Sequence, residues 1–387
     1  MRRVLWVCAG VAALAGLSLA FGPVREAAWA VLFLSDFFAG PSPSPFKLLA
    51  GEPELTSGVI ALGDSGGIPF DLYRCPAPRP QAGLLLTHGL AHLGNQDPRV
   101  REQAVRLARA GFVVVAPDLA QMKNYQLGFG DVDALAATLR HLRTLPEVDS
   151  TRIGLVAPSF AAGPALIALS RPQVQRQVRF ALIFGGYWDL RRTLRYTLTG
   201  AYDAEGFTGI VPLAANRHNR WKFLRGNLDL LAPSSSRGEY AAFLGAKIDD
   251  PLLDINPVLA NFSQEERQLL VFMDNEDPAR FDSLYAGLPT AVHAWVDTLS
   301  LHHYADQLRT KLLIAHSRAD QKVHFTESLT LSRHLPHAPP PEIHILGLFS
   351  HVDLRVSWES LRALWDELLP GLWQLYLLAL HLLRQGG

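Results

Sequence analysis

The chain has 387 residues, of which 49% are hydrophobic and 19% are charged, and these values are typical of a folded globular protein. Its 36 basic and 36 acidic residues cancel at pH 7 and no long run carries one sign of charge, which argues against nucleic acid as a partner. Two cysteines, Cys8 and Cys75, are too few for a disulfide framework or a thiolate metal site.

Residues 1–22 predict a signal peptide or a membrane anchor. Arg2 and Arg3 precede an apolar run that holds no charge until Arg25. Ser18-Leu19-Ala20 places small residues at the spacing that a signal peptidase recognises, but the run also approaches the length of a bilayer span, so both outcomes stay open. We therefore expect a membrane-associated or exported protein whose folded domain is extracytoplasmic.

Two further apolar segments flank the predicted domain. Residues 23–48 contain an apolar helix followed by a Pro/Ser linker, and this helix could lie on a lipid surface or pack on the domain. Residues 369–387 form an apolar C-terminal helix that is too short for a confident membrane span, so we expect it to be buried against the domain.

Between these segments, short apolar runs alternate with helical patterns at residues 98–110 and 131–144. Continuous β-branched runs indicate parallel strands covered by helices on both faces, whereas the first two runs alternate in polarity and indicate an antiparallel start. The pattern predicts an α/β fold with a mostly parallel eight-stranded sheet. The runs are TSGVIALG, GIPFDLYRC, AGLLLTHG, GFVVVAPD, TRIGLVAP, VRFALIFGG, KLLIAHS and PEIHILG.

Three polar residues follow predicted strands, at the sheet edge where open parallel sheets bind ligands. Ser159 stands between a strand and a helix of small residues, a turn that exposes a serine hydroxyl; taken alone it could be a helix N-cap. Asp320 follows the seventh strand and could also be a turn former, and His351 follows the eighth, as a candidate general base.

The order Ser159, Asp320, His351 resembles the serine, acid, histidine order of the α/β-hydrolase superfamily, over residues 55 to 368. The resemblance departs from the usual pattern at Ala157 and Ala161, where that superfamily carries glycines. It implies a catalytic triad of these three residues that needs no cofactor or metal. The resemblance also implies an oxyanion hole, formed by the backbone N–H groups of Phe160 and of Leu90, which follows His88-Gly89. Asp189, after the sixth strand, is the competing candidate for the acid.

The stretch from Trp188 to Gln307 is too long for a connection and carries helical patterns, which predicts a lid inserted after the sixth strand. We expect the core to comprise residues 50–190 and 308–368, and the helical lid residues 191–307. Candidate substrate-binding residues are His88, for which a structural role is the alternative, and the aromatic residues Tyr187 and Trp188.

These features favour a serine hydrolase that cleaves a small-molecule carboxylic ester or thioester with an apolar acyl or aryl group. Two alternatives stay open at this point. One is a peptidase or amidase of the same fold, and the other is a catalytically silent, membrane-associated binding protein. The sequence selects neither the substrate nor the oligomeric state.

Overall fold

The computed structural model describes residues 22–62, 66–212, 217–347 and 369–386, together with the backbone of residues 349–350 and 353–354. The predicted signal or anchor, residues 1–22, lies outside the described residues except for Gly22, and so does the candidate base His351. Among the helices of the described part, none is both long and apolar enough to cross a membrane.

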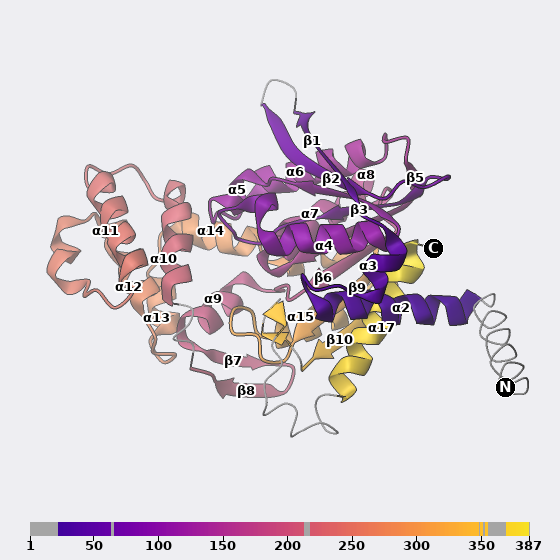
Figure 1. Ribbon diagram of the computed structural model, residues 1–387. Helices are drawn as coiled ribbons and strands as arrows, with labels where there is room; N and C mark the ends of the chain where they lie inside the picture. Colours follow the sequence, from indigo (N-terminus) through magenta and orange to yellow (C-terminus); the bar gives the residue numbers. More distant parts are fainter. Residues whose placement is uncertain are drawn as a thin grey trace, which may run out of the picture.

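The core is an eight-stranded sheet with the order β1-β2-β4-β3-β5-β6-β9-β10 (Figure 1). Strands β1 and β2 pair antiparallel, and β2 pairs antiparallel with β4, whereas the remaining pairs are parallel. The prediction of a mostly parallel eight-stranded sheet is therefore confirmed. The strands are β1 Glu54–Ala61, β2 Gly67–Arg74, β3 Gln81–Leu86, β4 Phe112–Pro117, β5 Val148–Pro158, β6 Phe180–Phe184, β9 Lys311–Ser317 and β10 Glu342–Leu346.

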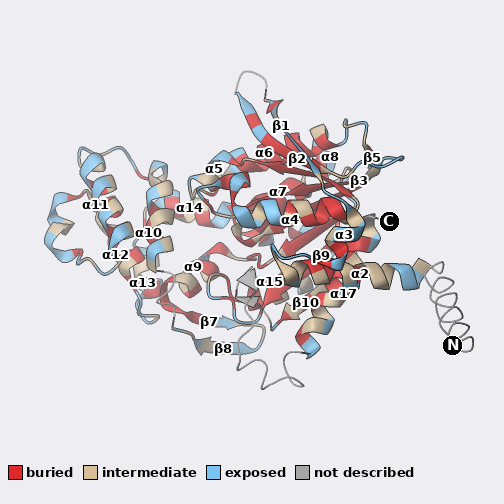
Figure 2. Cartoon of the chain, viewed as in Figure 1, coloured by how far each residue is buried: buried red, intermediate tan, exposed pale blue. Residues whose placement is uncertain are grey.

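Helices cover both faces of the sheet, which explains why its central strands are apolar on both sides (Figure 2). In β3, Leu84 and Leu86 belong to one buried cluster and Leu85 to the other. The first cluster includes residues of α2, α4 and α17, and the second includes residues of α6, α7 and α15. These helices are α2 Gly22–Ala39, α4 Pro98–Arg109, α6 Phe129–Leu142, α7 Ala162–Ser170, α15 Thr326–Arg333 and α17 Leu369–Gly386.

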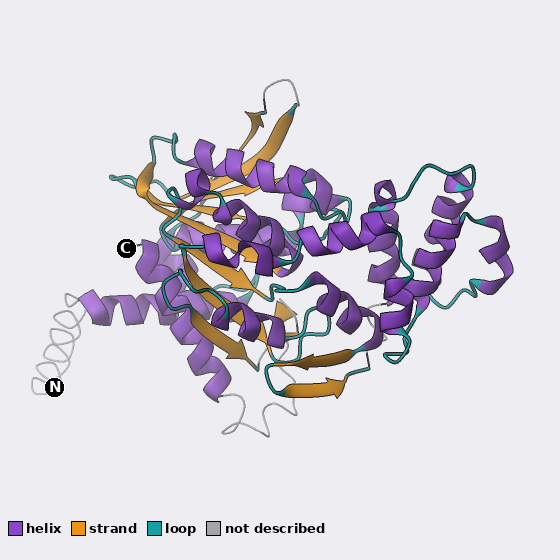
Figure 3. Cartoon of the chain, turned by 180° about the vertical axis from the view of Figure 1, so that it is seen from behind, coloured by secondary structure: helices purple, strands orange, loops and turns teal. Residues whose placement is uncertain are grey.

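An insertion separates β6 from β9 in the chain. Figure 3 shows that its helices α10 to α13 extend away from the sheet. The insertion lies where the sequence predicts a lid, but its action as a lid stays a prediction. Its elements are α9 Leu190–Thr199, β7 Ala201–Ala204, β8 Phe207–Ile210, α10 Arg217–Gly226, α11 Arg237–Asp249, α12 Gln264–Asp274, α13 Phe281–Ala286 and α14 Thr290–Thr298.

The two terminal helices pack on the same face of the core. Helix α2 contacts both α17 and α4, and it buries Ala30, Phe33 and Leu34. An ion pair of 2.8 Å between Arg384 and Glu26 joins the far end of α17 to α2. Of the two arrangements left open for residues 23–48, packing on the domain is the one observed, and the C-terminal helix is buried as expected.

A buried carboxylate connects α2 to α4. Asp36 is fully buried and accepts a 2.8 Å hydrogen bond from the hydroxyl of Ser44, which caps the short helix α3, Pro45–Ala50. Its other oxygen lies 3.8 Å from Nε of Arg106 and 3.7 Å from Nη1 of Arg109. A buried charge is unfavourable unless it is paired, so the contacts of Asp36 with these two arginines favour the packing of α2 against α4.

Candidate active site

Ser159 lies on a sharp turn between strand and helix. Strand β5 ends at Pro158, a 3₁₀ turn covers Ser159–Ala161, and α7 starts at Ala162. The φ of Ser159 is +56°, in the left-handed region that residues other than glycine rarely adopt. Such strain persists only where surrounding structure enforces it, and it often accompanies a functional side chain. The turn directs the serine hydroxyl outward at the carboxyl edge of the sheet, as a nucleophile requires.

The two alanines around Ser159 fit this turn. Ala157 and Ala161 are fully buried, because strand and helix approach each other closely there. Alanine would be unfavourable at these positions if the turn required a positive φ there. However, Ala161 has a φ of −63°, and the positive φ falls on the serine itself. The turn therefore needs small residues on both sides of Ser159 and does not require glycine.

The loop after β3 lies beside the serine. A Cβ atom built on Gly89 would lie 3.6 Å from the Cβ of Ser159. The next N–H group along the chain, that of Leu90, donates to no acceptor within the described part of the chain. The N–H of Phe160 lies in the first turn after the serine, where helical amides lack an acceptor within the helix. Two donors of this kind can stabilise a developing oxyanion, although their role stays a prediction.

His88 supports this loop. Its ring is fully buried, with Nδ1 2.7 Å from the carbonyl oxygen of Gly89 and Nε2 accepting a 2.9 Å hydrogen bond from the N–H of Leu119. Burial lowers the pKa of His88, although the hydrogen bond to Gly89 opposes this shift. Because both ring nitrogens are used within the protein, the geometry favours the structural alternative over direct substrate binding.

Asp320 follows β9 and is held rigidly. The residue is 1% exposed, and its Oδ1 accepts backbone hydrogen bonds from Lys322, at 2.7 Å, and Val323, at 3.1 Å. Its carbonyl oxygen accepts a 2.7 Å hydrogen bond from the hydroxyl of Tyr196. A carboxylate fixed in this way can orient an imidazole without moving during turnover.

His316 braces the same loop and is a residue that the sequence analysis missed. Its Nε2 lies 2.9 Å from the carbonyl of Val323 and 3.3 Å from Oδ2 of Asp320, and its Nδ1 lies 2.7 Å from the hydroxyl of Ser328. The bonds are satisfied when Nε2 carries the proton and Nδ1 accepts from Ser328. His316 belongs to the apolar run KLLIAHS, and a polar residue inside a buried strand is the signal that could have identified it.

Asp189, the competing acid, has a different task. Its side chain accepts a 2.8 Å hydrogen bond from the N–H of Arg192 and thereby caps the N-terminus of α9. This contact explains an aspartate at that position without a catalytic role. The predicted base His351 lies outside the described residues, in the chain between β11, Phe349–Ser350, and β12, Asp353–Leu354. The assignment of the triad stays a prediction.

No protein-family model matches the chain, and no curated protein is detectably similar to it. Among solved structures, dipeptidyl peptidase 4 of Porphyromonas gingivalis is 15% identical, with a TM-score of 0.48 over 87% of this chain and 36% of that one. An acylaminoacyl peptidase of Pyrococcus horikoshii is 14% identical, with a TM-score of 0.46 over 79% of this chain and 38% of that one. An esterase of Pyrococcus furiosus is 14% identical, with a TM-score of 0.46 over 87% of this chain and 92% of that one.

This chain thus spans 36% and 38% of the two peptidases. Sequence identities and TM-scores this low do not indicate the activity of this chain. Its fold is therefore identified from the order and direction of its strands. The sheet starts with an antiparallel strand pair, continues in parallel with the order β4-β3-β5-β6-β9-β10, and carries a serine at positive φ directly after β5. The chain has the α/β-hydrolase fold. In this fold the nucleophile, the acid and the histidine follow one another along the chain, which is the order of the predicted residues Ser159, Asp320 and His351.

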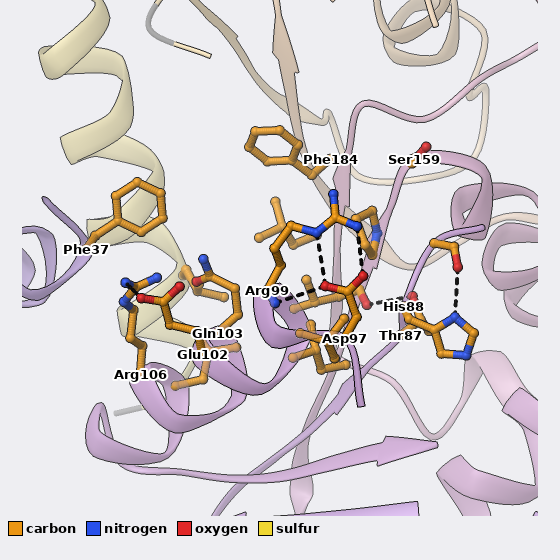
Figure 4. Close-up of a pocket in the computed structure, with 18 of the residues that line it drawn as sticks. Phe37, Thr87, His88, Asp97, Arg99, Glu102, Gln103, Arg106, Ser159 and Phe184 are labelled. Atoms are coloured by element: carbon orange, nitrogen blue, oxygen red, sulfur yellow. Dashed lines mark hydrogen bonds and ion pairs between the residues drawn. The ribbon is translucent and has the colours of Figure 1, made fainter. Parts of the chain in front are cut away.

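In this α/β-hydrolase fold a cavity of about 470 Å³ borders Ser159. Figure 4 shows Ser159 at one end of the view and Phe37 and Arg106 at the other, with Asp97 and Arg99 between them. The apolar lining comes from helices α2, α4 and α17 and from strands β3, β5 and β6. It includes Phe33, Leu34, Phe37, Leu86, Leu107, Val156, Leu182, Phe184, Leu375, Leu378, Ala379 and Leu382.

The described residues of the insertion after β6 contribute nothing to this lining. Tyr187 is fully buried and donates a 3.1 Å hydrogen bond to the carbonyl of Leu299. Its ring packs against Gly163, where a side chain would collide with it. Trp188 is 7% exposed, and its backbone N–H donates to the carboxylate of Glu327 in α15. Both aromatic residues therefore join the insertion to the core, and their positions do not support the expected contact with substrate.

Proposed function

We propose that the protein is a serine hydrolase that cleaves a carboxylic ester or thioester with an apolar acyl group through an acyl-enzyme. The observation that carries the proposal is the strained Ser159, which borders an apolar cavity beside the amide groups of Leu90 and Phe160. His351 would take the proton of Ser159 as the serine attacks the carbonyl, and Asp320 would hold the imidazole. The two amides would bind the oxyanion, and water would then release the acyl group.

The cavity suits the acyl chain of such a substrate. Its volume falls within the range of about 300–1,000 Å³ that is usual for small-molecule sites. Four charged residues of the lining form two pairs, since Arg99 lies 2.8 Å from Asp97 and Arg106 contacts Glu102. Paired charges leave little attraction for an ionic chain, whereas the aliphatic and aromatic side chains favour hydrocarbon.

The acyl-chain proposal predicts a dependence on chain length. Each buried methylene contributes about 0.8 kcal/mol, or about fourfold in kcat/KM. We expect kcat/KM for p-nitrophenyl esters to rise from acetate to an optimum between octanoate and dodecanoate. Ala379→Phe adds a ring to the cavity wall, so it should shift the optimum to shorter chains and lower kcat/KM for dodecanoate about 100-fold, with little change for acetate.

Leu377→Phe is the matched control, because Leu377 lies on the same helix but does not line the cavity. This variant should keep the chain-length profile of the wild type. An unchanged profile in folded Ala379→Phe protein would contradict the position of the acyl chain, and cleavage of acyl-peptide anilides in place of all esters would contradict the reaction class.

We also propose that residues 1–22 direct the protein to a membrane or across it. The apolar run after Arg2 and Arg3 supports this proposal, as do exposed apolar side chains on α3, where Leu48 is 82% exposed and Leu49 is 66% exposed. Full-length protein with a C-terminal tag should appear in the membrane fraction or in the exported fraction. A chain that keeps Met1 and stays in the cytoplasmic fraction would refute this proposal.

A further inference from the structure

A group of three metal-ligating side chains lies apart from Ser159, at the edge of the sheet. Glu342 and His344 alternate along the edge strand β10, so they share one face of it. His381 comes from α17, which packs against β10. One oxygen or nitrogen atom of each residue lies within 4.8 Å of the others. Glu342 is at the amino end of β10, whereas Ser159 follows the carboxyl end of β5.

The converging atoms lack hydrogen-bond partners among the described residues. Oε2 of Glu342, Nε2 of His344 and Nδ1 of His381 are all buried from solvent without a hydrogen bond. Glu342 and His381 are in ion-pair contact, but the geometry of this contact is not that of a hydrogen bond. A buried polar atom without a hydrogen bond is unfavourable, so three of them in one place point to a bound group that satisfies them together.

The surrounding contacts prepare these atoms as ligands. Nδ1 of His344 lies 2.8 Å from Oε1 of Gln374, which fixes the proton on Nδ1 and leaves the Nε2 lone pair directed into the group. Lys311 contacts the other oxygen of Glu342 at 2.6 Å. In metal sites, the second ring nitrogen of a ligating histidine usually donates its proton to a carbonyl or carboxylate oxygen, which fixes the orientation of the ring.

We propose that Glu342, His344 and His381 bind a divalent transition-metal ion of the Zn²⁺ class that fastens α17 to the edge strand. Two imidazoles and one carboxylate with a water molecule form a tetrahedral Zn²⁺ site with bonds of about 2.0–2.2 Å. Such bonds separate the ligand atoms by about 3.3 Å, so the Glu342 and His381 side chains would move slightly apart to admit the ion.

The ion would act on the position of α17 and not on bond cleavage. His381 lies between Ala379 and Leu382, which line the cavity beside Ser159. A metal ion bound by His381 would therefore fix the position of α17, and with it the part of the cavity lining that α17 provides. This inference stands independently of the proposed hydrolase activity, because it concerns metal content and stability.

The experiment uses the full-length protein freed of metal with a chelator and then titrated with Zn²⁺. We expect one Zn²⁺ to bind per chain and to raise the thermal midpoint by several degrees. His344→Ala and His381→Ala should lose both effects, and Gln374→Ala should weaken Zn²⁺ binding about 10- to 100-fold. Co²⁺ in the wild type should show the visible absorption bands of a tetrahedral site.

The matched control is His303→Ala. His303 belongs to another group of ligand-type residues, with Asp297 and His302, but all three are exposed, so this variant should bind Zn²⁺ as the wild type does. Glu342→Gln keeps the size of the side chain and covers the case in which an alanine variant fails to fold. The proposal is overturned if the wild type binds no Zn²⁺, or if Glu342→Gln lowers the midpoint equally with and without Zn²⁺, as a simple ion pair predicts.

Discussion

Ser159→Ala is expected to lower kcat for ester hydrolysis by about 10⁴-fold or more and to leave the fold intact. Removal of the nucleophile abolishes the acyl-enzyme route, and only the residual effects of oxyanion binding and substrate positioning remain. Alanine also avoids any steric conflict in the buried turn, although the positive φ at this position stays unfavourable. The measurement is kcat and KM on p-nitrophenyl octanoate, with the thermal midpoint of each protein.

Ser170→Ala is the matched control for this variant. Ser170 ends α7, the helix that follows Ser159, has the same 8% exposure as Ser159, and donates its hydroxyl to the carbonyl of Ile167. It should keep activity within about threefold of the wild type, since it does not line the cavity. A fluorophosphonate probe should label the wild type and Ser170→Ala but not Ser159→Ala. Equal labelling of all three proteins would remove Ser159 as the nucleophile, and no labelling of any would favour a binding protein.

Asp320→Asn is expected to lower kcat by about 10⁴-fold with a small change in KM. Asparagine has the size of aspartate, but it cannot stabilise an imidazolium and favours the wrong tautomer of the base. The amide oxygen can still accept the backbone hydrogen bonds from Lys322 and Val323, so the loop should keep its shape. The pKa that governs the pH profile of kcat/KM should fall, because the imidazolium of the base loses its anionic partner.

Asp189→Asn separates this role from that of the competing aspartate. Asparagine caps helices about as well as aspartate, so the N-terminus of α9 should remain formed and the activity should stay near that of the wild type. The reverse result, with activity lost in Asp189→Asn and kept in Asp320→Asn, would transfer the acid to the loop after β6.

The strands could be predicted from the sequence because their signal is local. Runs such as FVVVAP in β4 are apolar on both faces and bounded by turn residues, which is sufficient to identify a buried strand. The position of Ser159 is local in the same sense, since strand, turn and helix follow one another within a few residues. The topology then places Asp320 at the same edge of the sheet, after the strand that pairs with β6.

The walls of the cavity could not be predicted in this way. An apolar stripe indicates that a helix is buried but not which partner covers it, and the aromatic residues Tyr187 and Trp188 suggested the insertion as the wall. In the fold these two residues pack between core and insertion, while Phe33 and Leu375, from opposite ends of the chain, face the cavity.

By itself, the sequence determined the fold class, the eight strands and the serine turn, because hydrophobic periodicity and turn chemistry act between neighbouring residues. Only the tertiary structure decided which residues from distant segments meet. Docking of α2 and α17 forms the cavity, and packing of α17 on β10 brings His381 to Glu342. Such contacts depend on how whole elements pack, and no pattern within a single segment specifies that packing.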